Sequence, residues 1–187
     1  MTTSIEQIKG LSQGEWTADA SHSHITWSVR HAGISKVRGT FDSFTSTLNV
    51  GETLEQSSVV TDIDVASINS RDENRDGHVR GADFFDAENH PAISFRSTSV
   101  SGTPDDLVIE GELTIRGTSA PVTLTGELAG VTTDPFGITR TGVSASTSIS
   151  RKAFGITWNA ALEAGGVLVG DKVTIDLDVE YTAPQAA

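Results

Sequence analysis

Cysteine is absent from this chain of 187 residues, and basic residues are scarce. Without cysteine there is no disulfide, no thiolate nucleophile and no cysteine-ligated zinc. Only 13 Lys and Arg residues stand against 25 Asp and Glu residues, which gives a formal net charge of -12. Nucleic-acid binding depends on clustered cations that neutralise phosphates, so it is disfavoured. Anionic membrane surfaces should repel the chain for the same reason.

Long apolar runs are missing as well. No segment approaches the length of roughly 20 apolar residues that a membrane-spanning helix needs. Residues 1–16 contain one Lys and no continuous apolar stretch, so they do not read as a secretory signal. We therefore expect a cytoplasmic protein without stable membrane insertion. The length suits one domain, predicted over residues 15–183, with an N-terminal extension over 1–14 and a tail over 184–187.

The chain is rich in a period-two alternation of apolar and polar residues, which is typical of strands with one buried face. Ile25, Trp27, Val29 and His31 share one face of such a strand. Similar alternation covers residues 59–66, 113–115, 122–124, 143–149 and 173–181. These segments are predicted to be strands.

The alternation changes phase near Asp42 and Ser43. Apolar residues fall on odd positions up to Phe41 and on even positions from Phe44 onward. One extra residue at this point restores the pattern, as a β-bulge does, and bulges help a sheet to close. We therefore predict one long, bent strand over residues 34–49.

Turn residues separate the runs and give about eight strands, the number at which a closed barrel holds one small ligand. Helix signals are few: a short helix over residues 74–85, and one or two turns over 158–164. Only 6% of the residues are aromatic, which favours an elongated apolar cavity over an interior filled by side chains. The predicted fold is an all-β, eight-stranded antiparallel barrel with one or two short helices.

One segment resembles a calcium-binding loop. Asp72, Asn74, Asp76 and Gly77 match its opening positions. However, the twelfth position is Asp83 in place of Glu, and a strand is expected where the first helix of such a motif should be. We predict no calcium site, and the role of residues 72–83 stays open.

Histidines near the N-terminus invite a metal interpretation. His22, His24 and His31 follow Asp19 closely. In an extended strand the first two share a face and His31 points to the other, so three ligands from this segment do not converge. We predict no metal site.

Sequence templates for catalysis are missing too. The chain has no G-x-S-x-G, no H-E-x-x-H, no phosphate loop and no dinucleotide fingerprint. Asp19, Ser21 and His22 lie too close in sequence to suggest a triad by themselves. We expect no catalytic residue and no cofactor.

Charged and aromatic residues gather over 75–95. The structural interpretation is a corner in which Arg75 pairs with an acid, Asp83 caps a turn, and Phe84 and Phe85 plug one end of the barrel. The functional interpretation places the aromatic rings in a cavity lining and the charged groups on its rim. Both interpretations can hold together.

Several short motifs follow one another along the chain in a fixed order. They include Asp19-x-Ser21-His22-Ser23-x-Ile25-x-Trp27-x-Val29-x-His31, Val37-x-Gly39-x-Phe41, Arg75-Asp76-x-His78, Asp83-Phe84-Phe85-Asp86, Pro91-x-Ile93-x-Phe95-x-Ser97 and Arg151-Lys-x-Phe154-Gly155. In order and spacing, over residues 16–181, the chain resembles the YceI-like proteins, also called polyisoprenoid-binding proteins. Trp27 stands where Phe is usual in that family, which predicts a narrower or shorter pore.

The resemblance implies a lipocalin-like barrel with a polyisoprenoid, quinone-like or related long-chain lipid threaded along its pore, and no enzymatic activity. The predicted ligand-binding residues, with Phe84 and Phe85 added from the aromatic cluster, are Ile25, Trp27, Val29, His31, Phe41, Phe84, Phe85, Ile93, Phe95, Arg151, Phe154 and Trp158.

The predicted function is to bind, carry or sequester such a lipid. Two alternatives stay open. One is a lipid-modifying enzyme that uses His31, Asp76 or His78 in the pore. The other is a ligand-free, filled barrel with a stress-protective or interaction role. A homodimer is also left open.

Overall fold

A computed structural model describes residues 3–184 of the chain, and most of its regular secondary structure consists of antiparallel strands. The strands are β1 (Gly14–Ala18), β2 (His24–His31), β3 (Ser35–Phe41), β4 (Phe44–Val50), β5 (Ser58–Asp64), β6 (Ile68–Asn69), β7 (Ala92–Thr103), β8 (Asp106–Ile115), β9 (Thr118–Leu128), β10 (Thr132–Thr133), β11 (Thr139–Ser150) and β12 (Val169–Thr182). One α-helix, α1 (Glu73–Arg80), and the 3-10 turns η1 (Ile5–Gln7), η2 (Ala20–His22), η3 (Leu54–Gln56), η4 (Val65–Ser67) and η5 (Arg151–Phe154) complete it. Among the residues described, no helix is long and apolar enough to cross a membrane.

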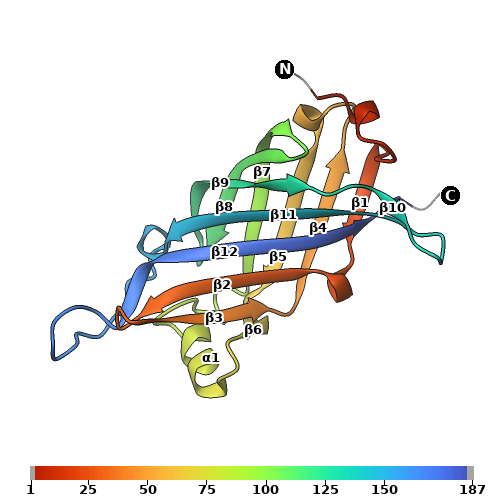
Figure 1. Ribbon diagram of the computed structural model, residues 1–187. Coiled ribbons are helices and arrows are strands. Elements are labelled where there is room, and N and C mark those ends of the chain that lie inside the picture. The colour runs from red at the N-terminus through yellow and green to blue at the C-terminus, as the bar shows by residue number, and fades with distance from the viewer. Residues whose placement is uncertain (1–2, 185–187) are drawn as a thin grey trace.

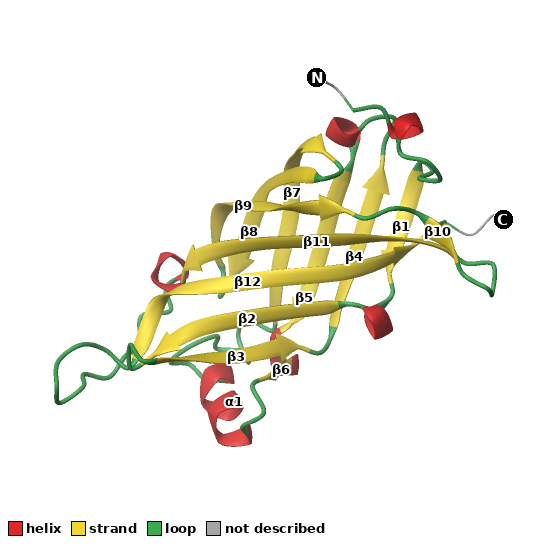
Figure 2. Ribbon diagram, viewed as in Figure 1, coloured by secondary structure: helices red, strands yellow, loops and turns green. Residues whose placement is uncertain are grey.

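Eight of the strands close into a barrel (Figures 1 and 2). The ring runs β12, β1, β4, β5, β7, β8, β9 and β11, and the pairing of β11 with β12 closes it. On the other edge of β12, β2 pairs with residues 169–178 and β1 with residues 181–182. The hairpin of β2 and β3, extended by β6, therefore lengthens the wall at one end. The predicted eight-stranded antiparallel barrel is confirmed.

The prediction of one bent strand over residues 34–49 is wrong. The phase change lies where expected, but the chain breaks there into β3 and β4. The two strands have different neighbours, because β3 pairs with β2 while β4 lies between β1 and β5. Asp42 stabilises the break by accepting hydrogen bonds from Thr40 Oγ1 (2.6 Å) and Asn69 Nδ2 (2.8 Å). A change of partner strand thus replaces the predicted bulge.

The helix predictions were partly right. Asp72 caps α1 by accepting from the backbone N–H of Arg75 (3.0 Å), and the helix ends at Arg80, earlier than predicted. No helix forms over residues 158–164. That segment belongs to a loop whose two glycines, Gly165 and Gly166, take positive φ values of 86° and 95°. Such values end a right-handed helix, and they allow the backbone N–H of Leu162 to donate to Gly166 (3.2 Å).

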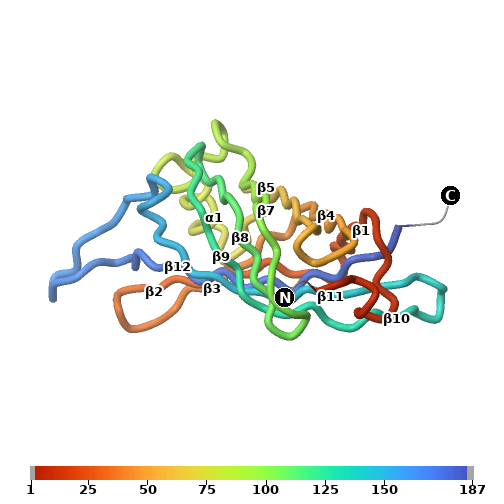
Figure 3. Tube along the Cα trace, turned by 90° about the horizontal axis from the view of Figure 1, so that it is seen from above, coloured from red at the N-terminus to blue at the C-terminus, as the bar shows by residue number. Residues whose placement is uncertain are grey.

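The two ends of the barrel differ. One end is closed by the N-terminal segment and η3, where Ile5, Leu11 and Leu54 are buried. Below them Trp16 is fully buried on β1, and its indole donates to the Ser12 carbonyl (2.9 Å). Helix α1 lies at the opposite end, and the blue loop over residues 155–168 projects beyond the β2–β3 hairpin (Figures 1 and 3). The domain bounds proposed above stay a prediction, and residues 185–187 of the proposed tail lie outside the described part.

Candidate functional site

The barrel encloses a cavity of about 320 Å³ with an almost wholly apolar lining. The longer strands present alternate residues to it, as the period-two pattern predicted; on β11 these are Val143, Ala145, Thr147 and Ile149. Along β12 the lining runs from Val169 to Tyr181, roughly 40 Å of strand at about 3.3 Å per residue. The cavity is therefore long and narrow, and its shape suits an extended chain.

The structure brings all twelve predicted ligand-binding residues to this cavity. They are Ile25, Trp27, Val29, His31, Phe41, Phe84, Phe85, Ile93, Phe95, Arg151, Phe154 and Trp158. Their assignment as ligand contacts stays a prediction, since no bound molecule defines the contacts.

Trp27 has an unusual environment in the lining. It pairs with Gly39 on β3, and its indole lies where a side chain of that residue would stand. The indole Nε1 is buried and makes no hydrogen bond within the described structure. A buried donor without a partner costs about 1–3 kcal/mol, so Trp27 is held here by packing. Whether it narrows the pore stays a prediction.

Aromatic rings surround the cavity at the α1 end. The His78 ring meets Trp158 edge to face at a centroid distance of 4.8 Å and Phe84 at 5.1 Å. The rings of Phe84 and Trp158 are 5.2 Å apart. His78 is exposed, and its Nε2 lies 2.9 Å from Asp83 Oδ2. Since the other end is sealed by buried apolar residues, this aromatic cluster marks the mouth of the cavity.

Arg151 is a buried cation that organises the mouth. Its guanidinium donates to the carbonyls of Gly170 (2.8 Å), Ile156 (2.9 Å), Trp158 (2.9 Å) and Val169 (3.2 Å). Desolvation lowers the pKa of Arg151, and the nearby Asp171 carboxylate opposes this shift. Two bonds to the loop and two to the start of β12 indicate that Arg151 holds the segment carrying Trp158 in place.

Two details of the 75–83 segment differ from expectation. Arg75 does not pair directly with an acid: its Nε donates to Ser70 Oγ (2.7 Å) and its Nη2 to the Ser70 carbonyl (2.8 Å). Asp76 is buried and accepts from the backbone N–H (2.9 Å) and hydroxyl of Ser70, outside the cavity lining. The lipid-modifying alternative therefore has His31 and His78 in the cavity but not Asp76. The segment that resembled a calcium loop is largely helix α1, with Asp72 as its cap.

Sequence reasoning missed three hydroxyl groups in the cavity lining. Ser46 Oγ lies 2.8 Å from Thr61 Oγ1 and 2.8 Å from the Tyr181 hydroxyl. Burial raises the pKa of Tyr181 to about 12. Each residue falls on the inward phase of its strand, so the alternation contained the signal, but strand pairing was needed to bring the three together.

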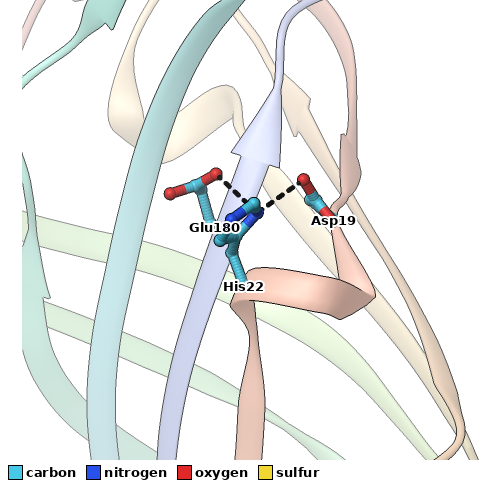
Figure 4. A group of neighbouring side chains, drawn as sticks. All are labelled: Asp19, His22 and Glu180. Atoms are coloured by element: carbon cyan, nitrogen blue, oxygen red, sulfur yellow. Dashed lines mark hydrogen bonds and ion pairs between the residues drawn. The ribbon is translucent and has the colours of Figure 1, made fainter. Parts of the chain in front are cut away.

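A charged cluster lies outside the cavity, where β11 and β12 meet the turn after β1. His22 Nδ1 lies 2.9 Å from Asp19 Oδ2 and 3.6 Å from Glu180 Oε1 (Figure 4). Arg140 Nη1 contacts the same two carboxylates, at 2.8 and 2.6 Å. Hydrogen bonds from Ser21, Arg140 and His22 lower the pKa of Asp19.

This cluster is better explained as an ion-pair network than as a metal site. In the described part of the chain it is the one group of three or more His, Cys, Asp or Glu whose ligand atoms converge. The Arg140 guanidinium already pairs with both carboxylates, and a metal cation would face its charge. Of the three histidines considered above, only His22 belongs to the group; His31 lines the cavity.

Similar proteins share this architecture. A UPF0312 protein of Staphylococcus aureus (strain USA300) is 33% identical over 172 residues, covering 89% of this chain and 96% of the relative. Among solved structures, Burkholderia cenocepacia BcnA superposes with a TM-score of 0.74 at 23% identity, covering 87% of this chain and 98% of BcnA. A polyisoprenoid binding domain from Saccharophagus degradans superposes with a TM-score of 0.66 at 16% identity, covering 90% and 98%.

The sequence motifs, the closed barrel and its long apolar cavity agree with one family. The YceI-like domain model matches residues 16–181, which is most of the chain. The chain belongs to the YceI-like family.

Proposed function

We propose that this protein binds a long isoprenoid-type lipid inside the barrel and carries or sequesters it. The observation that carries the proposal is the cavity, which is long, almost wholly apolar and lined at its α1 end by the rings of His78, Phe84 and Trp158. A branched or unsaturated hydrocarbon chain matches such a lining by shape and by polarity.

Burial of apolar area supplies the driving force. Each 100 Å² of lipid surface removed from water contributes about 2.5 kcal/mol, while association itself costs about 4–15 kcal/mol. Several isoprene units inside the barrel therefore suffice for tight binding. Because an apolar lining selects a lipid by its width and length more than by its polar groups, the cavity should also accept homologous tails.

Relatives support the choice of ligand. The Saccharophagus degradans domain of similar fold is named as polyisoprenoid binding. By analogy, an isoprenoid tail is the first candidate for this cavity. The prediction of a cytoplasmic location and the question of a homodimer rest on the sequence alone and stay open predictions.

Binding is favoured over the two alternatives. An enzyme needs an acid or base beside the reacting atoms; Asp76 is bonded to Ser70 away from the cavity, which leaves this alternative with His31 and His78 alone. A filled barrel would have bulky side chains meeting across the pore, whereas this one retains about 320 Å³ of space. The carrier interpretation needs only what the geometry already provides.

A cavity-blocking substitution tests the proposal. Thr147 lines the cavity on β11, and the preceding residue, Ser146, is exposed on the outer face of the same strand. Thr147→Phe should weaken binding of a polyprenyl quinone at least tenfold, measured by quenching of tryptophan fluorescence. Ser146→Phe, the matched control, should bind as the wild type does. Equal binding by both variants, or no binding by the wild type, would contradict the proposal.

A further inference from the structure

The hydroxyls of Ser46, Thr61 and Tyr181 lie at the inner end of the cavity. Ser46 is two residues before Leu48 on β4, and Thr61 is two residues after Val59 on β5. Leu48 and Val59 line a small apolar pocket together with Ile5, Leu11 and Leu54, the apolar plug that closes this end of the barrel. The hydroxyl cluster therefore lies one inward position from the plug, far from the mouth.

The hydrogen bonds within this cluster do not satisfy it. Three hydroxyls carry three O–H donors, and two hydrogen bonds join them, both involving Ser46. Whichever way the protons point, one O–H in the described structure has no acceptor. Ser46 and Tyr181 are each 3% exposed and Thr61 is half-buried, and all three line the cavity, so the free O–H belongs to a group in the cavity wall. An unpaired donor in such surroundings is costly unless a bound molecule accepts from it.

Cationic groups in the lining lie at the other end. Arg151 bonds to Gly170 and Val169, and His31 pairs with Val169, at the start of β12. Tyr181 lies 12 residues further along that strand. The inner end thus offers hydroxyls and no positive charge, a combination that suits an uncharged oxygen.

We propose that the cluster of Ser46, Thr61 and Tyr181 binds a neutral hydroxyl or carbonyl oxygen at the leading end of the lipid, which enters the barrel polar end first. This inference rests on the proposed function, because it concerns the same cavity. The ligand is then an isoprenoid alcohol or a carbonyl-bearing lipid whose apolar tail extends back toward the aromatic mouth.

A matched pair of ligands tests the inference. Geranylgeraniol and the hydrocarbon of the same skeleton without its hydroxyl would be offered from the same cyclodextrin carrier. The wild-type protein should bind the alcohol about tenfold more tightly than the hydrocarbon. Tyr181→Phe and Ser46→Ala should each reduce this ratio to below threefold while leaving the hydrocarbon affinity within twofold.

Thr147→Val is the control, because it removes a hydroxyl from the same cavity outside the cluster. It should keep the tenfold preference. If both ligands bind the wild type equally, or if the preference survives Tyr181→Phe and Ser46→Ala, the inference is wrong and the proposed function stands. If neither ligand binds, both fail.

The direction of entry has its own readout. A photoreactive diazirine beside the ligand hydroxyl should crosslink to β4, β5 or the end of β12. Crosslinks to α1 or to residues 155–168 would place the polar end at the mouth and overturn the inference.

Discussion

The indole of Trp27 lies against Gly39 on the neighbouring strand, and no Cβ atom fits between them. The same hypothetical Cβ would also meet the carbonyl oxygen of Asn69 on β6. Three strands thus approach one another through a glycine. This contact fixes where one of the two tryptophan side chains of the cavity wall lies.

Gly39→Ala should therefore be destabilising. Overpacking against both a ring and a backbone carbonyl costs about 1–3 kcal/mol in the free energy of unfolding, measured by urea denaturation. Gly130→Ala is the control, since a Cβ there meets nothing within 4 Å. A stability loss equal in both variants would show that the Trp27 contact is not the cause.

Trp27→Phe should leave stability within about 1.5 kcal/mol of the wild type, because the lost contacts are offset by removal of the unpaired indole N–H. The smaller ring should also widen the cavity. We expect the variant to hold longer or bulkier polyprenols, measured as the largest homologue retained in native mass spectrometry. An unchanged size limit would show that Trp27 does not restrict the pore.

Arg151→Met should loosen the mouth. The substitution leaves two loop carbonyls and two carbonyls at the start of β12 without their donor, and we expect a loss of about 2–4 kcal/mol in unfolding free energy. Amide hydrogen exchange over residues 155–168 should accelerate more than exchange in β8. Uniform acceleration across the barrel would mean that Arg151 stabilises the whole fold rather than this loop.

The ion-pair network around Asp19 predicts that the free energy of unfolding depends on pH in the acidic range. Its hydrogen bonds hold the pKa of Asp19 below the unfolded value of about 3.9. The unfolded state therefore binds the proton first, so this stabilisation is present above about pH 4 and is lost as the pH falls toward the folded pKa.

Arg140→Gln should raise the pKa of Asp19 and flatten that dependence, compared by urea midpoints between pH 2.5 and pH 6. Arg96→Gln, which breaks an exposed pair with Asp62, is the control and should leave the slope unchanged. A wild-type slope that survives Arg140→Gln would contradict the assignment.

The sequence predicted what depends on local alternation. Inward and outward faces of the strands follow from period two, whereas the twelve predicted ligand-binding residues came from the resemblance to the YceI-like family and from the aromatic cluster. The pairing of strands could not be predicted from the local pattern. The break at Asp42 separates two strands because β3 and β4 pair with different neighbours.

The hydroxyl cluster is another product of pairing. Ser46, Thr61 and Tyr181 lie on three strands, and their contact depends on registers that residue patterns do not encode. The same holds for Arg151, whose four acceptors come from residues 5 to 19 positions away. A side chain that bonds to backbone groups distant in the sequence can be recognised only in the folded structure.

Native mass spectrometry of protein purified without detergent, followed by organic extraction, tests the central claim most directly. The account predicts a stoichiometric adduct that releases a long-chain lipid with masses spaced by isoprene units. A protein that is bare, and stays bare after incubation with polyprenols and polyprenyl quinones, would contradict it.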